Sequence, residues 1–397
     1  MALVRFVNRY AAGVPAAGSA PAGAMNLVLL NSIRAYGGGE RLVVALAREF
    51  RRAGHAVQVL ARAEGALLAR CHGEGVAATA FDFGHSLDPR RARDLVARLR
   101  DGAADVVIAF DPRSARTAAL AARLWRRRRG QGGWSLVYYH GLEGSLGRTW
   151  LHRYLLGGAV SLYVANAAAL RDELLAMGWI APERVTVIYG GIDLARIERA
   201  DPAGVRAELG VPDDAFVLLV AGRLVADKGH ALLLDVLAEI AGDFPRLSVW
   251  FAGEGPERAA IKRRIAELGL GGVVRLLGFR DDLPRLLRAA DLLCHPSRRE
   301  GIPNVVREAM AAGLPVVATA ASGTPELVRH GETGLLSPVD DRTALAANLV
   351  AVLRDAELRR RLGEAGRARA RAEFSDTECA RQWLERLAAL RRREGCR

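Results

Sequence analysis

The stretch EGIPNVVREAMAAGLPVVA, residues 300–318, predicts one helix followed by one short strand. Proline near the start of a helix and glycine just past its end are the usual boundaries, and Pro303 and Gly313 stand at those places. The apolar run 316–318 then predicts a buried strand. A helix leading directly into a buried strand is typical of parallel α/β proteins.

Two carboxylates, Glu300 and Glu308, lie eight positions apart in this stretch. We expect Glu300 in the loop just before the helix, beside its free N–H groups, and Glu308 in the second helical turn. A helix N-terminus attracts anions, and a carboxylate accepts hydrogen bonds from hydroxyls. The pair therefore suits a ligand that carries both hydroxyls and phosphates.

Outward from this stretch, short apolar runs alternate with helical patterns along most of the chain. The runs that predict strands are 25–31, 55–60, 105–110, 135–139, 162–165 and 185–188, followed by 216–221, 247–252, 274–277, 292–295 and 316–318. This alternation predicts two Rossmann-like halves with parallel sheets, facing each other across a cleft. Ligands of such sheets bind at the carboxyl ends of the strands. A helix over 41–53 follows the first strand.

The length of 397 residues suits two domains rather than one core. We predict a disordered extension over 1–24, an N-terminal domain over 25–195, a C-terminal domain over 196–375 and a last helix over 376–397. A polar stretch, 196–203, is expected to be the linker. The apolar runs near the N-terminus are interrupted by glycine and proline, so no transmembrane helix is predicted.

The formal net charge of +13 indicates either solvated arginine-rich faces or an anionic partner. Among partners we favour an anionic membrane surface. Nucleic acid is not expected, because no helix-turn-helix or aromatic-interleaved basic motif occurs. The four cysteines lack metal-ligand spacing, which favours reduced thiols in the cytoplasm. We therefore expect a cytoplasmic protein, peripheral at the inner face of the cytoplasmic membrane.

The Glu-x7-Glu pair and the segments around it resemble the retaining, nucleotide-sugar-dependent glycosyltransferases of family four, which have the GT-B fold. The segments that carry the resemblance are GGVVRLLGFRDDLPRLLRAADLLCHPSRREG (271–301) and GTPELVRHGETGLLSPVDD (323–341). The resemblance extends over 25–375. It implies a GT-B fold in which the helix 376–397 packs back on the N-terminal domain.

Arg223 and Lys228, in AGRLVADKGH, follow the first strand of the second half. Two cations at the carboxyl end of a strand can stabilise a diphosphate that leaves during transfer. Solvated loop cations are the alternative. The segment is similar to the family's G-R-x-x-x-x-K-G pattern, which implies catalytic and donor-binding roles for both. Gly38 and Gly39 match the family's glycine loop, which faces the donor phosphates.

The resemblance also assigns roles to the two glutamates. Glu300 is expected to be catalytic and to contact the donor-sugar hydroxyls. It acts together with the loop and helix start that follow it, whose substrate-binding members are Gly301, Ile302 and Asn304. Glu308 is expected to hold the ribose hydroxyls, although an ordinary helix-surface acid is the alternative.

Three further features complete the implied site. His140, in YYHG, matches the catalytic histidine that reaches across the cleft to the donor sugar in this family, and Glu143 is a further candidate near the acceptor. Gly253 lies in a turn similar to the family's G-x-G-P turn and, with 277–280, is expected to shape the nucleobase pocket. Gly323 begins a loop whose counterpart faces the donor. The chain has no Asp-x-Asp, so no metal site and no metal requirement are predicted.

These features predict a retaining, metal-independent glycosyltransferase of the hexosyltransferase type. It would move a sugar from a nucleotide diphosphate donor, UDP first and GDP second, to a glycan or lipid-linked acceptor in cell-surface polysaccharide, lipopolysaccharide or glycolipid biosynthesis. The alternatives are a sugar-phosphate synthase on the same fold and a non-catalytic nucleotide-sugar-binding scaffold. The sugar, the linkage and the oligomeric state stay open.

Overall fold

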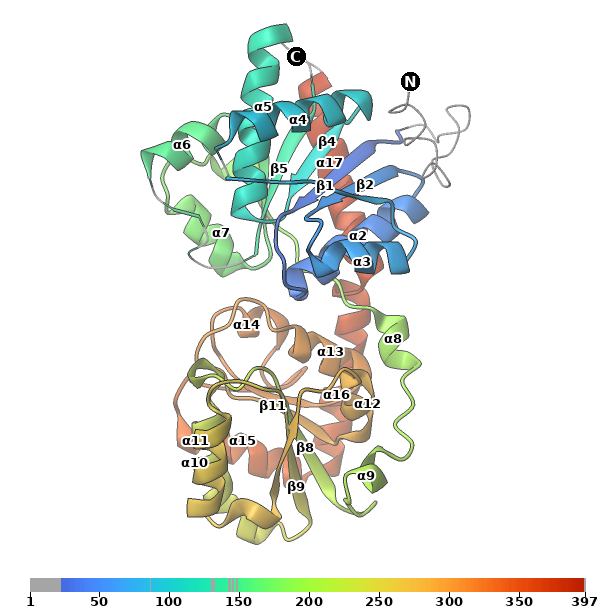
Figure 1. The fold of residues 1–397 in the computed structure, drawn as a ribbon. Helices are drawn as coiled ribbons and strands as arrows, with labels where there is room; N and C mark the ends of the chain where they lie inside the picture. Colours follow the sequence, from blue (N-terminus) through green and yellow to red (C-terminus); the bar gives the residue numbers. More distant parts are fainter. Residues whose placement is uncertain are drawn as a thin grey trace. The chain divides into compact units, whose positions relative to one another are not determined.

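The computed structural model describes residues 23–85, 87–129, 133–141, 144, 146–147 and 149–395. It divides into two compact units, Met1–Gly191 with Asp376–Arg397 and Ile192–Ser375 (Figure 1). The extension predicted over 1–24 lies almost wholly outside the described residues. Each unit is a parallel sheet covered by helices, so the two Rossmann-like α/β halves expected from the sequence are confirmed.

The first unit contains a seven-stranded parallel sheet of order β3-β2-β1-β4-β5-β6-β7. Its strands are β1 (Asn26–Asn31), β2 (Ala56–Ala61), β3 (Ala78–Ala80), β4 (Val106–Ala109), β5 (Ser135–His140), β6 (Val160–Ala165) and β7 (Val185–Val187). From β1 the chain adds β2 and β3 on one side of the sheet, and it then adds β4 to β7 on the other side of β1. The carboxyl ends of β1 and β4 therefore flank the switch point where such sheets bind ligands.

Helices cover both faces of this sheet. They are α2 (Gly38–Arg52), α3 (Ala66–Gly73), α4 (Pro89–Asp101), α5 (Pro112–Arg129), α6 (Trp150–Gly157), α7 (Ala168–Leu175) and α17 (Asp376–Gly395). Helix α17 packs beside α2, and its Trp383 is fully buried against Phe110 and Tyr139. The end of the chain is thus part of the first unit's core.

The second unit contains a six-stranded parallel sheet of order β10-β9-β8-β11-β12-β13. Its strands are β8 (Phe216–Ala221), β9 (Leu247–Ala252), β10 (Val274–Gly278), β11 (Leu292–His295), β12 (Val316–Thr319) and β13 (Leu335–Ser337). Here the switch point lies between β8 and β11. Strands β8, β9, β11 and β12 are almost continuously buried because helices cover both faces of the sheet.

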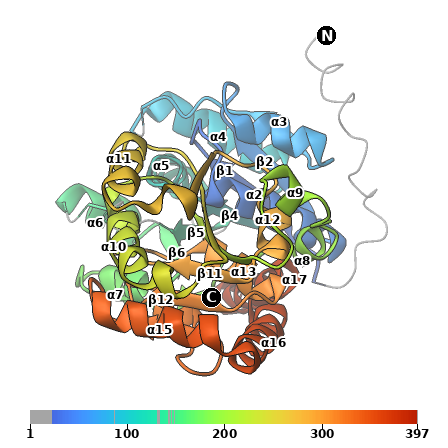
Figure 2. The ribbon, with the colours of Figure 1, turned by 90° about the horizontal axis from the view of Figure 1, so that it is seen from below.

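The helices of this unit are α8 (Leu194–Glu198), α9 (Val205–Glu208), α10 (His230–Ile240), α11 (Arg258–Glu267), α12 (Leu283–Ala289), α13 (Asn304–Ala312), α14 (Thr324–Leu327), α15 (Arg342–Arg354) and α16 (Ala356–Glu373). Helices α10, α11 and α15 pack together on one face, and α12, α13 and α16 on the other (Figure 2).

The structure corrects three details of the sequence analysis. The unit boundary falls at Gly191/Ile192, four residues before the predicted one, because Ile192 pairs with Ser375 and its N–H donates to the carbonyl of Phe374. The expected linker is partly helical, since α8 covers most of its first half. The strands β3 and β13, three residues each, were not predicted because so short a run carries no usable periodicity.

Among the described residues, no helix is both long enough and apolar enough to span a bilayer.

Candidate active site

The switch point of the second unit brings Lys228 and Glu300 together. Lys228 ends a short 3-10 helix, Ala226–Lys228, in the loop after β8, and Glu300 lies in the loop after β11, the neighbouring strand. Glu300 Oε1 accepts a hydrogen bond from Lys228 Nζ. Two residues close to Glu300 in sequence bind the same oxygen: His295 Nε2 at 2.7 Å and Ser297 Oγ at 2.8 Å.

The Glu300 carboxylate is nearly enclosed, with its side chain 10% exposed, and Lys228 is 22% exposed. Burial raises the pKa of Glu300, but the hydrogen bond and charge of His295 and the charge of Lys228 outweigh it and bring the pKa to about 2. Glu300 is therefore ionised at neutral pH and can only accept hydrogen bonds, so His295 Nε2 carries the proton that it shares with Glu300.

This depressed pKa predicts a contribution to acid stability. A carboxyl group whose pKa falls from 4.5 to about 2 on folding stabilises the protein above pH 4.5, and this contribution disappears as the pH drops towards 2. It amounts to about 3 kcal/mol at pH 7. We expect Glu300→Gln to lack this pH dependence. Urea unfolding of both proteins between pH 7 and pH 3 measures it, and identical pH slopes would contradict the assignment.

Close backbone contacts hold the loops around this cluster. Gly229 has a positive φ of 67°, and a Cβ there would lie 1.8 Å from the carbonyl oxygen of Pro296, so only glycine fits. The N–H of Arg298 donates to the carbonyl of Asp227 at 2.7 Å. The backbones of the loops after β8 and β11 thus contact each other on either side of Lys228 and just before Glu300.

The loop after β12 packs against the Glu300 loop from the other side. A Cβ at Gly323 would lie 2.1 Å from the carbonyl oxygen of Gly301 and 2.7 Å from Ile302 Cδ1. Nothing lies within 4 Å of a Cβ at Gly301, so the backbone there is open. Gly323, which the sequence analysis placed at the start of a donor-facing loop, is therefore next to two predicted substrate-binding residues.

Helix α13 places the remaining residues of the 300–318 stretch as predicted, with Glu300 in the loop before it and Glu308 in its second turn. Asn304 is its first residue, and the side-chain oxygen of Asn304 accepts a hydrogen bond from Arg307 Nη2. The Asn304 side chain is thus engaged within the helix. What it can offer a ligand is its backbone N–H, which lies in the first turn and has no helical partner.

Arg223 contrasts with Lys228. It lies two residues past β8 and is exposed, and the described part of the chain gives its side chain no hydrogen bond or ion pair. Lys228 is instead engaged by Glu300. An exposed guanidinium without a carboxylate partner, at the carboxyl end of a central strand, is suited to binding an anion.

Gly253 has a packing role in addition to any ligand contact. It follows β9 directly, and a Cβ there would lie 1.8 Å from the carbonyl oxygen of Gly222, which follows the neighbouring strand β8. A Cβ at Gly255 would likewise lie 2.3 Å from the carbonyl oxygen of Leu224. The two glycines let the loops after β8 and β9 lie against each other.

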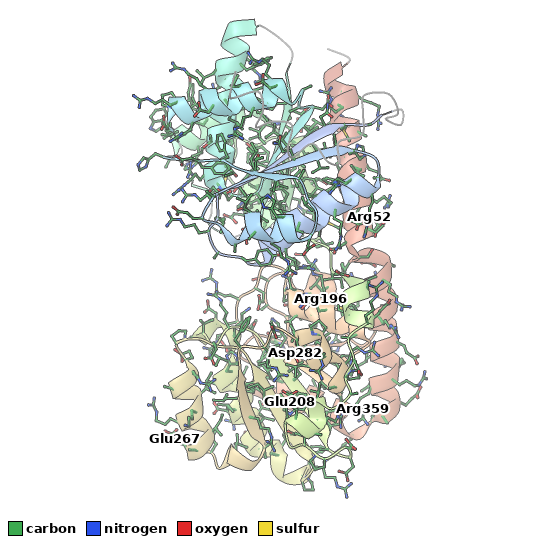
Figure 3. All side chains as sticks on the ribbon, turned by 45° about the vertical axis from the view of Figure 1, so that its right-hand side comes forward. Arg52, Arg196, Glu208, Glu267, Asp282 and Arg359 are labelled. Atoms are coloured by element: carbon green, nitrogen blue, oxygen red, sulfur yellow. The ribbon has the colours of Figure 1, made fainter. Side chains whose placement is uncertain are left out.

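The segment 277–280, predicted to shape a nucleobase pocket, is fixed by charge. Arg280 Nη1 lies 2.7 Å from Glu208 Oε1, and Arg280 also forms a two-point contact with Asp282 at 2.8 Å. Arg196 donates to the carbonyl of Asp281 at 3.1 Å. Figure 3 labels Arg196, Glu208 and Asp282 in this unit. Carboxylates thus engage the Arg280 side chain. The neighbouring Phe279 side chain is 78% exposed.

In the first unit, Gly38 and Gly39 are the first two residues of α2, not part of a loop before it. Gly37 is the N-cap, and its N–H donates to Glu40 Oε2 at 2.9 Å. The other oxygen of Glu40 accepts from Asn31 Nδ2 at 2.9 Å. The glycine start of the helix is thus anchored to the end of β1, and nothing lies within 4 Å of a Cβ at Gly39.

At the switch point of the first unit lies Asp111, which is 4% exposed. Its carboxylate accepts from the Ser32 N–H at 2.7 Å and the Ser32 hydroxyl at 2.6 Å. It also accepts from the N–H groups of Arg113 and Ser114 at 3.0 Å, at the start of α5. The ends of β1 and β4 are joined by this one side chain.

His140 ends β5 in the first unit and is fully buried. Its Nε2 lies 3.3 Å from Glu173 Oε2 of α7, and the other oxygen of Glu173 accepts from the N–H of Gly144 at 2.9 Å. Burial lowers the pKa of His140 despite the opposing effect of Glu173, so the imidazole is neutral at pH 7. Glu143 lies outside the described residues.

Several residues that hold the predicted site residues in place were not predicted from the sequence. They are His295 and Ser297 beside Glu300, Glu173 beside His140, and Glu40 and Asp111 in the first unit. A signal existed for His295, because a polar residue ending a buried strand lies where ligands of such sheets bind. No sequence signal pointed to Glu173, which lies 33 positions from its partner.

The two units match two family models. Residues 204–369 match the model described as "Glycosyl transferases group 1", and residues 36–196 match "Glycosyltransferase Family 4". Together the matches cover most of both units and include Lys228, Glu300 and His140. With the two parallel α/β units, they define the chain as a glycosyltransferase of the GT-B class. The second unit thus matches the group 1 glycosyltransferases and the first unit glycosyltransferase family 4, and the GT-B class expected from the sequence is confirmed.

Several curated proteins are similar to this chain. The lipopolysaccharide core biosynthesis glycosyltransferase LpsE of Rhizobium meliloti is 31% identical over 226 residues, which cover 57% of this chain and 64% of LpsE. A D-inositol 3-phosphate glycosyltransferase of Nocardioides is 36% identical over 246 residues, covering 57% and 53%. The chain thus spans about half to two thirds of the length of these curated relatives.

Among solved structures, HepE of Anabaena in complex with UDP superposes with a TM-score of 0.80 and 27% identity, over 92% of this chain and 100% of HepE. The same protein has also been solved in complex with UDP-glucose, with a TM-score of 0.76.

Proposed function

We propose that this protein is a retaining glycosyltransferase that moves a sugar from a nucleotide diphosphate donor to a hydroxyl of a glycan or lipid-linked acceptor. The observation that carries the proposal is the Lys228–Glu300 pair at the switch point of the second unit, with the exposed Arg223 on the same loop as Lys228. Cations there can bind the diphosphate, and an ionised carboxylate can accept hydrogen bonds from sugar hydroxyls. The same cluster can therefore bind both the diphosphate and the sugar of a nucleotide sugar.

In the proposed reaction, the bond between the anomeric carbon and the diphosphate breaks, and the acceptor oxygen bonds to the same face of that carbon. The acceptor proton passes to the departing phosphate. Arg223 and Lys228 would stabilise the charge that develops on the leaving diphosphate. Glu300 would orient the sugar, held in place by His295 and Ser297. Glu308, in the second turn of α13, would accept hydrogen bonds from the ribose hydroxyls.

The proposed donor carries UDP. The supporting fact is that HepE, similar over 92% of this chain, binds UDP and UDP-glucose. GDP is the second candidate. The proposed acceptor is a growing cell-surface glycan, since LpsE acts in lipopolysaccharide core biosynthesis. Acceptor recognition is assigned to the first unit.

Nucleotide binding tests the donor assignment. We expect UDP to raise the melting midpoint more than GDP, ADP or dTDP, because a ligand at 100 times its Kd adds about 2.7 kcal/mol to the stability. The measurement is a thermal shift of the full chain, with and without Mg²⁺, since we propose binding without a metal ion. A larger shift with GDP would reassign the base, and a shift that requires Mg²⁺ would contradict the metal-independent site.

The thermal shift, combined with an assay of sugar transfer and donor hydrolysis, separates the alternatives. A shift without sugar transfer or slow donor hydrolysis would favour a nucleotide-sugar-binding scaffold. Transfer to soluble sugar phosphates in preference to lipid-linked glycans would favour a sugar-phosphate synthase. No nucleotide-dependent shift at all would contradict the proposed function.

A further inference from the structure

The positive charge of the chain is concentrated in one segment. Residues 112–171 contain ten arginines and one acidic residue, Glu143, so this segment carries +9 of the net charge of +13. The segment runs from the start of α5 through β5, α6 and β6 to the first turns of α7, all within the first unit. Elsewhere in the chain, acidic residues nearly balance the basic ones.

Helix α6 in the middle of this segment exposes two large aromatic side chains. Trp150 is 77% exposed and Tyr154 is 53% exposed, whereas Leu155 and Leu156 on the other side of the helix are buried. Positions four apart share one face of a helix, so the two rings lie on the same side. Figure 1 shows α6 beside α5 at the margin of the first unit.

Three arginines lie on helix α6 or next to it. The guanidinium carbon of Arg123, on α5, lies 4.2 Å from the centre of the Tyr154 ring. Arg126, also on α5, donates to the carbonyl of Gly158 at the end of α6, at 2.9 Å. Arg153 is exposed on α6 itself. We name Trp150, Tyr154, Arg123, Arg126 and Arg153 the α6 patch.

None of the arginines in this patch has a carboxylate partner among the described residues. This differs from the second unit and α17, where exposed arginines such as Arg264, Arg360 and Arg381 bind acidic side chains. Arginines without an internal counter-ion can bind anionic groups on a partner, and exposed tryptophan and tyrosine can enter an apolar layer. Together they suit a partner surface whose outer groups are anionic and whose interior is apolar.

We infer that the α6 patch docks the first unit onto an anionic lipid bilayer. Tryptophan and tyrosine favour the level of the lipid headgroups, where the ring is partly buried and its polar atom stays hydrated. Arginines nearby bind the anionic headgroups, and their apolar stems can lie along the same boundary. Nucleic acid is the less suitable partner, because the patch presents one short helix and no extended basic groove.

Vesicle cosedimentation of the full chain tests this inference, independently of donor and acceptor. The probes are vesicles of phosphatidylcholine alone and vesicles that also contain phosphatidylglycerol. We expect binding to the anionic vesicles only, and weaker binding at high salt because exposed charges are then screened. Equal binding to both vesicles, or none to either, would overturn the inference.

Variants locate the surface. Trp150→Ala with Tyr154→Ala should weaken binding to anionic vesicles about tenfold, and Arg123→Ala or Arg153→Ala about fivefold each. The matched controls lie in the second unit: Phe279→Ala removes an aromatic ring that is 78% exposed, and Arg263→Ala removes an exposed charge. Controls that weaken binding as much as the patch variants would contradict the location.

Two further outcomes keep this inference apart from the proposed function. If the patch variants lose vesicle binding but still transfer sugar to a soluble acceptor, docking and catalysis are separate properties of the chain. If single-stranded RNA displaces the protein from vesicles and binds it more tightly at the same salt concentration, the patch is a nucleic-acid surface and the lipid assignment is wrong.

Discussion

Lys228→Ala is expected to lower kcat for sugar transfer by about 100-fold or more, the effect of removing one preorganised charge-stabilising donor. The ammonium group lies at the switch point, where the diphosphate is proposed to leave, and it is partly shielded from water. Its charge is therefore more effective there than on an exposed surface. The variant should also bind UDP more weakly. Initial rates at saturating donor and calorimetric titration with UDP measure both effects.

Composition gives this experiment a matched control. The chain has 57 basic residues, of which only Lys228 and Lys262 are lysines. Lys262 is exposed on α11 in the same unit, so Lys262→Ala makes the same chemical change away from the cluster. Lys228→Arg keeps the charge but replaces a compact ammonium with a planar fork, and should recover only part of the rate. A Lys228→Ala enzyme within threefold of wild-type kcat would remove the leaving-group role.

Glu300→Gln is expected to separate donor binding from transfer. The glutamine keeps the shape of the side chain but removes the charge that engages Lys228, His295 and Ser297. Lys228 is then free of its carboxylate partner, so UDP should bind as tightly as to the wild type or more tightly. Transfer should nevertheless fall by about 100-fold, because the sugar hydroxyls lose an anionic acceptor.

The opposite changes in affinity and rate distinguish this result from simple unfolding. A damaged site would lose both, whereas the predicted variant keeps or improves UDP affinity while losing kcat. Glu267→Gln is the matched control, since Glu267 pairs with Arg263 and Arg264 on the surface of the same unit. Weaker UDP binding by Glu300→Gln, together with an unchanged rate, would contradict both the competition for Lys228 and the proposed role in orienting the sugar.

The sequence predicted most of the fold because its strongest signals are local. Buried parallel strands read as continuous apolar runs, and β8, β9 and β11 have the predicted bounds. Glycine and proline ended the α13 segment where the structure ends it. Boundaries that depend on pairing between distant parts of the chain were displaced, such as the one set by Ile192 and Ser375.

For the candidate site, the sequence alone determined the residue types and their order along the chain: two cations after one strand, and two carboxylates around the start of a helix. Only the tertiary structure decided that Lys228 and Glu300, 72 positions apart, share one hydrogen bond, and that His295 and Ser297 bind the same oxygen. Spacing along the chain fixes which face of a helix or strand a side chain occupies. Strand order, which depends on long-range packing, fixes which loops meet.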